Sequence, residues 1–459
     1  MMVKRSLCAA LLLAGLLICA GASGQPTPPV MPQVQEVELP PPVALPPPAE
    51  APAAAPTAPI TAAEAVAIAL HNQPAVAVAS AGVAAAQGRT QATRAALQPQ
   101  LALTAGINAS DVQGNENGAG APPNFQAAAT LRQLVYDYDH TRDLVRQAQA
   151  QESVARAALT TVQADLVLRV KRAFYSHWQS VRLVTVAESN LRNQQQHYAL
   201  AQARLLSGLG LPYDVVRAQT AYTAAIYGLT VARNAAVQSR VALAQLMGLD
   251  PRTPLAPADG AETATPLPSV QELVDEAVAN RPEMAQANAA ILSARYAAAA
   301  ARTVNSPIVT GSLGLSRKGD EFVPETGLVT LGVGVQWNAL DGGLTKGRVQ
   351  ETEANVQAVT AQLEAVRLQV IADVSGAYLD LLTAEQRALT AQAEVTNATE
   401  ALRLAEGRYR SGLGVFIDVL DAQAALDEAS TKRVNTRSEV EQARAALERA
   451  VGRNLPPPG

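Results

Sequence analysis

Two long stretches of the chain have the apolar and polar spacing of very long helices. They cover about residues 139–206 and 343–410, and both are almost free of glycine and proline. Ala, Gln, Leu, Arg and Glu, which favour helix, dominate them. At 1.5 Å per residue, a helix of this length reaches about 100 Å. No compact globular core needs such a helix, so the heptad-like apolar spacing predicts coiled-coil packing.

A shorter return helix is expected after each long helix, at about residues 211–247 and 415–451. Gly208 and Gly412 lie between the two members of each pair. Glycine adopts the left-handed conformation that commonly ends a helix, and so it marks a turn here. Each half of the chain therefore predicts an antiparallel helical hairpin.

Before each long helix the pattern changes to that of short strands. One strand pair is expected at about residues 101–136 and the other at 308–337, each interrupted by a loop rich in turn formers. Residues 333–337 alternate between large apolar side chains and Gly or Gln, as a strand with one buried face does.

These elements belong to two copies of one unit. Segment 204–219 matches segment 408–423 at a constant offset, with the same Ser-Gly-Leu-Gly turn followed by Asp-Val and Ala-Gln. The first structural repeat spans residues 60–248 and the second spans 268–453. A Pro-rich linker, residues 249–267, joins them.

The two ends of the chain lie outside the repeats. Residues 1–24 have a basic start, a short apolar run and small residues, the pattern of a secretory signal peptide. Residues 25–59 form a Pro/Ala-rich lead-in expected to be disordered, and residues 454–459 form a Pro-rich tail. Both cysteines, Cys8 and Cys19, lie in the signal segment, and Cys19 leaves lipid attachment open as an alternative.

Composition excludes several function classes. The chain has 36 basic and 40 acidic residues, so no basic surface indicates nucleic acid. Its 4 histidines lack the close spacing of a metal site. We find no phosphate-binding glycine loop, nucleophile elbow or catalytic carboxylate pair, and so expect neither an enzyme nor a cofactor. After residue 24 no apolar run is long enough for a transmembrane helix.

A mainly α fold with a small β-barrel portion follows from these elements. Four strands per chain are too few to close a barrel, and an open sheet edge cannot face lipid. Three copies would supply about twelve strands, which is within the range of outer-membrane barrels. The long hairpins would then form a periplasmic α-barrel below a trimeric outer-membrane β-barrel, and together the two make a conduit.

The two predicted hairpin turns, at residues 206–219 and 409–423, resemble the hairpin tips of TolC-family channels. Residues 340–346 resemble the strand-to-helix junction of that family, and residues 136–142 follow it more loosely. The resemblance covers about residues 60–453. It implies a homotrimer in outer-membrane lipid that docks to a periplasmic adaptor protein coupled to an inner-membrane pump, in efflux or type I secretion.

The resemblance also implies roles for individual residues. Asp418 and Asp421, which share a helix face, would line a periplasmic constriction as rings of carboxylates that favour cations. The alternative is that these acids only stabilise a helix N-terminus. Tyr409 and Asp214 match residues that close the tip in the family. Gly414 stands where some relatives have a basic residue, which removes one possible link.

Eight residues of the two turns would meet the adaptor: Ser207, Gly208, Leu209, Gly210, Ser411, Gly412, Leu413 and Gly414. A simple helix-ending turn explains the same glycines. For the whole protein, the alternative function is a periplasmic coiled-coil scaffold or adaptor without a pore. Such a scaffold would not need strand-like runs at matching places in both repeats.

Overall fold

The computed structural model describes residues 59–108, 124–258, 267–319 and 326–453. The expected signal peptide with Cys19, residues 25–58 of the lead-in, the middle of the linker and the Pro-rich tail lie outside the described residues.

Each half of the chain supplies the same series of elements. The first half has α1 (Ala62–Asn72), α2 (Pro74–Ala95), β1 (Gln100–Asn108), β2 (Asn124–Tyr136), α3 (His140–Leu206) and α4 (Pro212–Leu246). The second half has α5 (Val270–Asn280), α6 (Pro282–Thr303), β3 (Ile308–Gly319), β4 (Thr326–Gln336), α7 (Leu344–Arg410) and α8 (Phe416–Val451). The mainly helical fold class with four strands is confirmed.

The short helices α1 and α5 begin with the same capping box. The Thr61 hydroxyl accepts a hydrogen bond from the Glu64 amide at 3.2 Å, and the Thr61 amide donates to the Glu64 carboxylate at 2.8 Å. Ser269 and Glu272 make the equivalent pair of bonds in the second half. Each box satisfies two N–H groups that would otherwise lack partners, and so fixes where the helix starts.

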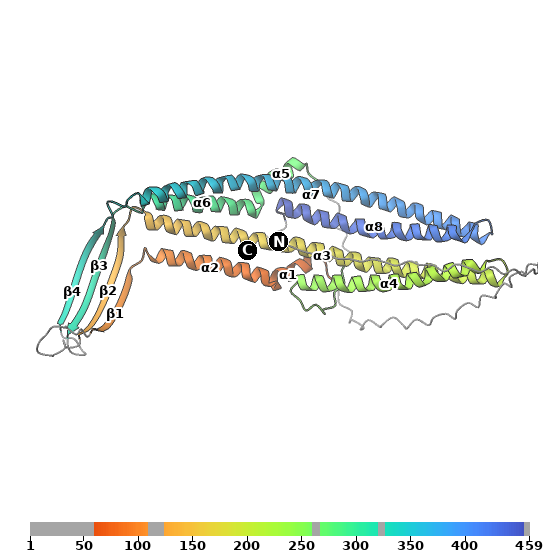
Figure 1. The fold of residues 1–459 in the computed structure, drawn as a ribbon, viewed down its shortest axis with the longest axis horizontal. Helices are drawn as coiled ribbons and strands as arrows, with labels where there is room; N and C mark the ends of the chain where they lie inside the picture. Colours follow the sequence, from red (N-terminus) through yellow and green to blue (C-terminus); the bar gives the residue numbers. More distant parts are fainter. Residues whose placement is uncertain (1–58, 109–123, 259–266, 320–325, 454–459) are drawn as a thin grey trace, which may run out of the picture. The chain divides into compact units, whose positions relative to one another are not determined.

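The helices pack as two open layers that share α3 and α7 (Figure 1). Next to the sheet the order is α2, α3, α6, α7, and toward the hairpin turns it is α4, α3, α8, α7. The short helix α1 packs on α3, and α5 packs on α7 and α8. The first half therefore supplies one edge of each layer, and α7 of the second half supplies the other edge.

The four strands form one antiparallel sheet in the order β1, β2, β3, β4. Its register places Leu101, Leu131, Leu313 and Leu331 in one row across all four strands. Most rows on that face are apolar and solvent-exposed, with Leu331 83% exposed. Rows on the opposite face carry mainly Thr, Ser, Gly, Gln and Arg. The sheet thus has one apolar and one largely polar face, both uncovered in the single chain.

A β-bulge near the end of β2 that leads into α3 changes which face of the sheet the side chains lie on. The register shifts between Leu134 and Tyr136, so Tyr136 rather than Val135 pairs with Val309. Since Val309 pairs with Val335, the bulge moves the Tyr136 side chain onto the apolar face. The Tyr136 ring lies 4.9 Å from that of Tyr138, just beyond the strand.

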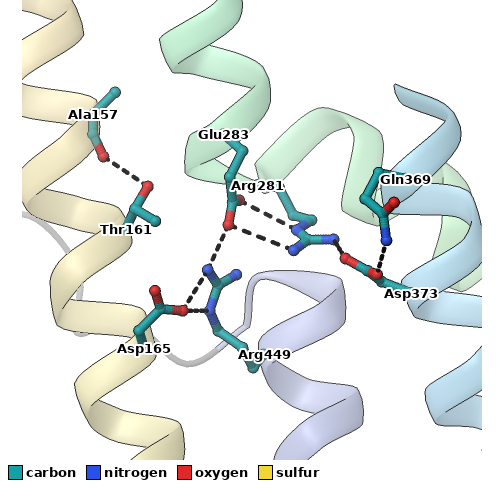
Figure 2. Close-up of polar contacts among 8 residues, drawn as sticks. All are labelled: Ala157, Thr161, Asp165, Arg281, Glu283, Gln369, Asp373 and Arg449. Atoms are coloured by element: carbon teal, nitrogen blue, oxygen red, sulfur yellow. Dashed lines mark hydrogen bonds and ion pairs between the residues drawn. The ribbon is translucent and has the colours of Figure 1, made fainter. Parts of the chain in front are cut away.

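A network of ion pairs around two buried arginines joins helices from both halves (Figure 2). Arg449 of α8, whose side chain is 8% exposed, donates to Asp165 of α3 at 2.8 Å and also pairs with Glu283 of α6. Arg281 binds the same Glu283 and reaches Asp373 of α7 at 2.9 Å. Burial alone would raise the pKa of Glu283, but Arg449 and Arg281 outweigh it, so this pKa is lowered.

Among the described residues, no single helix has the length and apolar character needed to cross a membrane. The bent pair of α1 and α2, which meet at an angle of 49°, passes that test of length and composition as a pair.

Candidate functional site

The two hairpin turns have nearly the same backbone geometry. Gly208 and Gly412 follow the ends of α3 and α7 with φ angles of 74° and 78°, the left-handed conformation that glycine adopts without strain. The Leu209 amide donates to the Arg204 carbonyl at 2.9 Å, and the Leu413 amide donates to the Arg408 carbonyl at 2.9 Å. Pro212 then begins α4 in the first turn of the helix, where its missing N–H costs nothing.

Close backbone approach explains the second glycine of each turn. A Cβ at Gly210 would lie 2.8 Å from the Leu205 amide nitrogen, which is closer than real Cβ contacts allow. At Gly414 the tightest contact would be 3.0 Å, to the Cβ of Arg408. Both positions therefore favour glycine for the turn itself, whatever else the turn contacts.

The expected docking residues lie on the surface of the turns. Ser207, Gly208, Ser411 and Gly412 are exposed, and Gly210 and Gly414 are half-buried. Leu209 is 73% exposed and Leu413 is 78% exposed. Leu206, at 89%, and Leu211, at 63%, extend this apolar surface around the first turn. Leucines exposed to this extent at the end of a hairpin form a surface suited to a protein partner.

Behind the turns, one apolar cluster holds the two hairpins together. Its buried members come from all four long helices: Ala201, Val215, Ala218, Leu402, Tyr409, Phe416 and Val419. Tyr409 is 3% exposed, and its ring lies 5.2 Å from that of Phe416. The Tyr409 hydroxyl has no hydrogen-bond partner among the described residues. The ring is thus an anchor between the hairpins.

Arg204, for which the sequence predicted no role, makes a polar link between the two hairpins next to their turns. Its guanidinium group lies over the Tyr409 ring, 4.5 Å from the centroid, and donates a hydrogen bond to the Tyr409 carbonyl. The sequence contained one signal, because Arg204 and Arg408 are identical residues of the repeat. Arg408, however, is exposed, so the repeat alone could not show which arginine forms the link.

Asp214 lies in the same electrostatic environment as Tyr409 and Arg204. Burial raises the pKa of Asp214, while the positive charges of Arg204 and Arg217 partly oppose this. Burial also raises the pKa of Tyr409, with a further contribution from the negative charge of Asp214. The structure therefore brings Tyr409 and Asp214 close together, and the positive charge of Arg204 acts on the pKa of both.

Asp418 and Asp421 lie on one exposed face at the start of α8. Asp418 is in the first turn, where a carboxylate interacts favourably with the helix dipole. No described basic side chain forms an ion pair with either residue. Their negative charges are therefore available to ions or to other copies of the chain. No group of described His, Cys, Asp and Glu side chains could hold a metal ion.

Comparison with known proteins identifies the chain's relatives. The family model for outer membrane efflux proteins matches residues 65–249 and 273–453. Protein CyaE of Bordetella pertussis is 28% identical over 397 residues, which are 85% of this chain and 83% of the relative. Outer membrane efflux protein BepC of Brucella suis is 24% identical, over 70% of this chain and 71% of the relative.

The fold has solved counterparts. A crystal structure of CusC, from a study of transmembrane channel formation, matches with a TM-score of 0.77 at 18% identity, covering 85% of this chain and 92% of CusC. The chain therefore belongs to the outer membrane efflux protein family, and it is an outer-membrane channel protein that extends into the periplasm and serves as an exit duct for efflux or secretion.

Proposed function

We propose that three copies of the chain close into one continuous duct, which passes cargo without catalysing any reaction. The open edges of the protein carry this proposal. Both helical layers and the sheet have one edge from the first half, at α2, α4 and β1, and the other edge from the second half, at α7 and β4. The first-half edge of one copy can therefore pack against the second-half edge of the next copy. Such head-to-tail contacts form a closed ring when the rotation that relates neighbouring copies adds up to a full turn.

Apolar stripes along the edge helices support this ring. Beyond Leu344 in its first turn, the exposed leucines of α7 are Leu368, Leu379, Leu382, Leu389 and Leu404. At 100° per residue, they fall within about 80° of one another around the helix. The exposed large apolar residues of α4 also share one face: Tyr213, Val216, Tyr227, Val231, Val237 and Val241. Stripes at helical spacing are typical of a buried helix–helix contact.

The sheet supports the same assembly. Three sheets of four strands would give about twelve strands, and pairing of β1 with β4 of the next copy would leave no open edge. The apolar face would contact lipid and the polar face would line the lumen. A conduit of this kind is favoured over the alternative of a scaffold without a pore, which has no use for such a sheet.

At the other end, the hairpin tips would form the periplasmic entrance. Asp418 and Asp421 from three copies would make two rings of carboxylates in a narrow space, where their field favours cations. Arg204, Tyr409 and Asp214 would hold each pair of tips in the closed arrangement. The exposed turn leucines would dock a periplasmic adaptor, which couples the duct to an inner-membrane pump.

Ion conductance in a planar lipid bilayer tests the entrance. We expect small, cation-selective currents from the wild-type protein. The double variant Asp418→Ala/Asp421→Ala should give larger currents with less selectivity, because it removes six carboxylates from the entrance of a trimer.

A matched control removes two exposed carboxylates elsewhere, in Glu351→Ala/Glu364→Ala on α7, and should leave the currents nearly unchanged. Wild-type selectivity that survives in Asp418→Ala/Asp421→Ala would contradict the proposed rings. A protein that inserts well and conducts nothing in either form would contradict the open duct.

A further inference from the structure

A cavity of about 680 Å³ lies where α3, α7 and α8 meet, away from the hairpin turns. Its polar lining consists of Arg182 of α3, Gln392 of α7, and Arg433 and Arg437 of α8. Trp178 of α3 contributes the aromatic surface. A volume of this size is typical of sites for small organic molecules, which span about 300–1,000 Å³.

The cavity is strongly basic. Three arginines line it, together with the apolar Ala388 and Val434, and no acidic residue is among the lining residues. No described side chain forms an ion pair with Arg433 or Arg437. Acids close to these arginines along α7 and α8 have partners of their own. Glu394 binds Lys432 at 2.7 Å, Glu439 lies 3.9 Å from Arg387, and Glu441 lies 3.4 Å from Arg444. Positive charge is therefore concentrated in this cavity.

Two of the arginines, Arg182 and Arg437, lie over the indole ring of Trp178. The indole is 8% exposed, so it is fixed in the helical packing. The guanidinium carbon of Arg437 lies 5.1 Å from the indole centroid, and that of Arg182 lies 5.9 Å from it. Because the guanidinium group of Arg437 lies over an aromatic ring, its N–H donors remain at its edge. This arrangement pre-orients at least one fork of donors for a planar oxyanion.

We infer that this cavity binds an organic anion, with a carboxylate or phosphate group on Arg433 and Arg437 and an apolar or aromatic body against Trp178 and Val434. Arginine is suited to this role because its planar fork matches the geometry of these oxyanions. The adjoining indole and aliphatic surface favour a ligand with an apolar part over a bare inorganic ion. The inference concerns the wall of the duct and is independent of the Asp418 and Asp421 rings.

Tryptophan fluorescence offers a direct test, because the chain has only 2 tryptophans, Trp178 and Trp337. In a Trp337→Phe background, emission reports on Trp178 alone. We would titrate the purified full-length protein in detergent with benzoate and, separately, with inorganic phosphate, at constant ionic strength. We expect a saturable change with benzoate at lower concentration than with phosphate.

Substitution of the arginines tests whether they bind the anion. Arg433→Gln/Arg437→Gln should weaken benzoate binding by at least about tenfold, since hydrogen bonds to charged groups contribute about 1.5–3 kcal/mol and about 1.4 kcal/mol is tenfold in affinity. The control Arg367→Gln/Arg403→Gln removes the same net charge from two exposed α7 residues that pair with Glu364 and Glu400. That control should bind benzoate like its parent.

Three results would overturn the inference: a change that never saturates, benzoate binding that survives in Arg433→Gln/Arg437→Gln, or phosphate binding as tight as benzoate binding. Titration calorimetry on the protein with both tryptophans provides the same comparison, should Trp337→Phe disturb folding. Trp337 donates a hydrogen bond to the Asn305 carbonyl at 3.0 Å, well removed along the chain from the cavity.

Discussion

At the scale of single residues, the contact between α3 and α8 contains buried polar groups. Gln423 is 0% exposed and donates a hydrogen bond to the Asp427 carboxylate at 2.9 Å. The Gln423 side-chain oxygen faces Asn193 and His197 of α3, each at 3.4 Å. Burial raises the pKa of Asp427 to about 6, although the Gln423 bond opposes this. An ionised Asp427 is therefore less favourable in the folded state than a protonated one.

The first prediction concerns the pH dependence of this contact. A pKa raised in the folded state means that protonated Asp427 favours folding, so its contribution is full below about pH 4 and is lost as pH rises through about 6. Asp427→Asn keeps the acceptor and removes the charge. At pH 8 we expect it to stabilise the protein by about 1 kcal/mol, allowing for partial screening by solvent. At pH 4 the variant should match the wild type.

Thermal unfolding in detergent at the two pH values measures this difference. The control is Glu428→Gln, which neutralises the exposed acid next in sequence and should change neither value. An equal shift of the two variants at pH 8 would mean that the burial of Asp427 has no energetic effect.

Arg204 gives a second prediction at this scale. Arg204→Met removes both the guanidinium group over Tyr409 and the hydrogen bond to its carbonyl. Together these interactions contribute about 1–2 kcal/mol to the contact between the tips. We expect larger or more frequently open currents in planar bilayers. Arg408→Met, the repeat-equivalent change at an exposed position, is the control, and currents equal to those of Arg204→Met would argue against a specific link.

At the scale of elements, the two strand-to-helix junctions have the same left-handed backbone conformation but form it with different residues. Tyr138 and Asp139 adopt φ angles of 56° and 64°, and their repeat equivalents are Gly342 and Gly343, at 62° and 94°. The carboxylates of Asp137 and Asp341 both cap the first turn, accepting from the amides of Thr141 and Thr345 at 2.8 Å, and Asp341 also accepts from the Gly343 amide at 3.0 Å. The left-handed conformation costs energy in the first copy only, because glycine lacks the Cβ that causes the strain.

The third prediction follows from this asymmetry. Asp139→Gly should raise the free energy of unfolding by about 0.5–1 kcal/mol by relieving the backbone strain. The Asp139 side chain caps no amide. Its ion pair with Arg142 joins two side chains that are 52% and 64% exposed, and such pairs contribute little to stability.

The reciprocal change Gly343→Asp should lower stability, although a Cβ there meets nothing within 4 Å. Denaturant unfolding gives the free energy of unfolding of each variant. If both variants were as stable as the wild type, backbone strain at these positions would be excluded.

At the scale of the whole molecule, the described part of the chain leaves apolar surface uncovered on one sheet face and on two edge helices. Its core is divided among clusters at the level of α1, at the level of α5 and behind the tips. Long helices in single layers cannot bury both sides within one chain. Lipid and further copies of the chain are the environments that would cover what remains exposed.

The fourth prediction concerns the α7 edge as a contact between neighbouring copies in the proposed ring. Leu382→Asn/Leu389→Asn places two amides in the α7 stripe, where Leu382 is 41% and Leu389 68% exposed. Burying a leucine contributes about 1.5–3 kcal/mol, and three equivalent contacts would be affected. We expect the particle mass, measured by light scattering in detergent, to shift from three chains toward one. Leu292→Asn on α6, away from both edges, should leave the mass unchanged, and an unaltered mass in the α7 variant would rule out this edge as the contact.

Local sequence signals determined much of this protein. Helix formers, the Ser-Gly-Leu-Gly turns and the alternation of apolar residues predicted the hairpins and the strand pairs, because each depends on backbone preferences within a few residues. The internal repeat then supported each prediction a second time. The resemblance to the TolC family directed attention to Asp214, Tyr409, Asp418 and Asp421. Their roles in constriction and closure stay predictions.

Only the tertiary structure decided features that join elements far apart in the chain. Strict alternation would place Tyr136 on the polar face of the sheet, and the bulge opposite β3 reverses this. Arg204 and Arg408 are identical in the repeat, yet only Arg204 stacks on Tyr409 of the other hairpin. The basic cavity exists because α3 brings Trp178 against α8. Each depends on pairing between the two halves, which a pattern read along one segment does not contain.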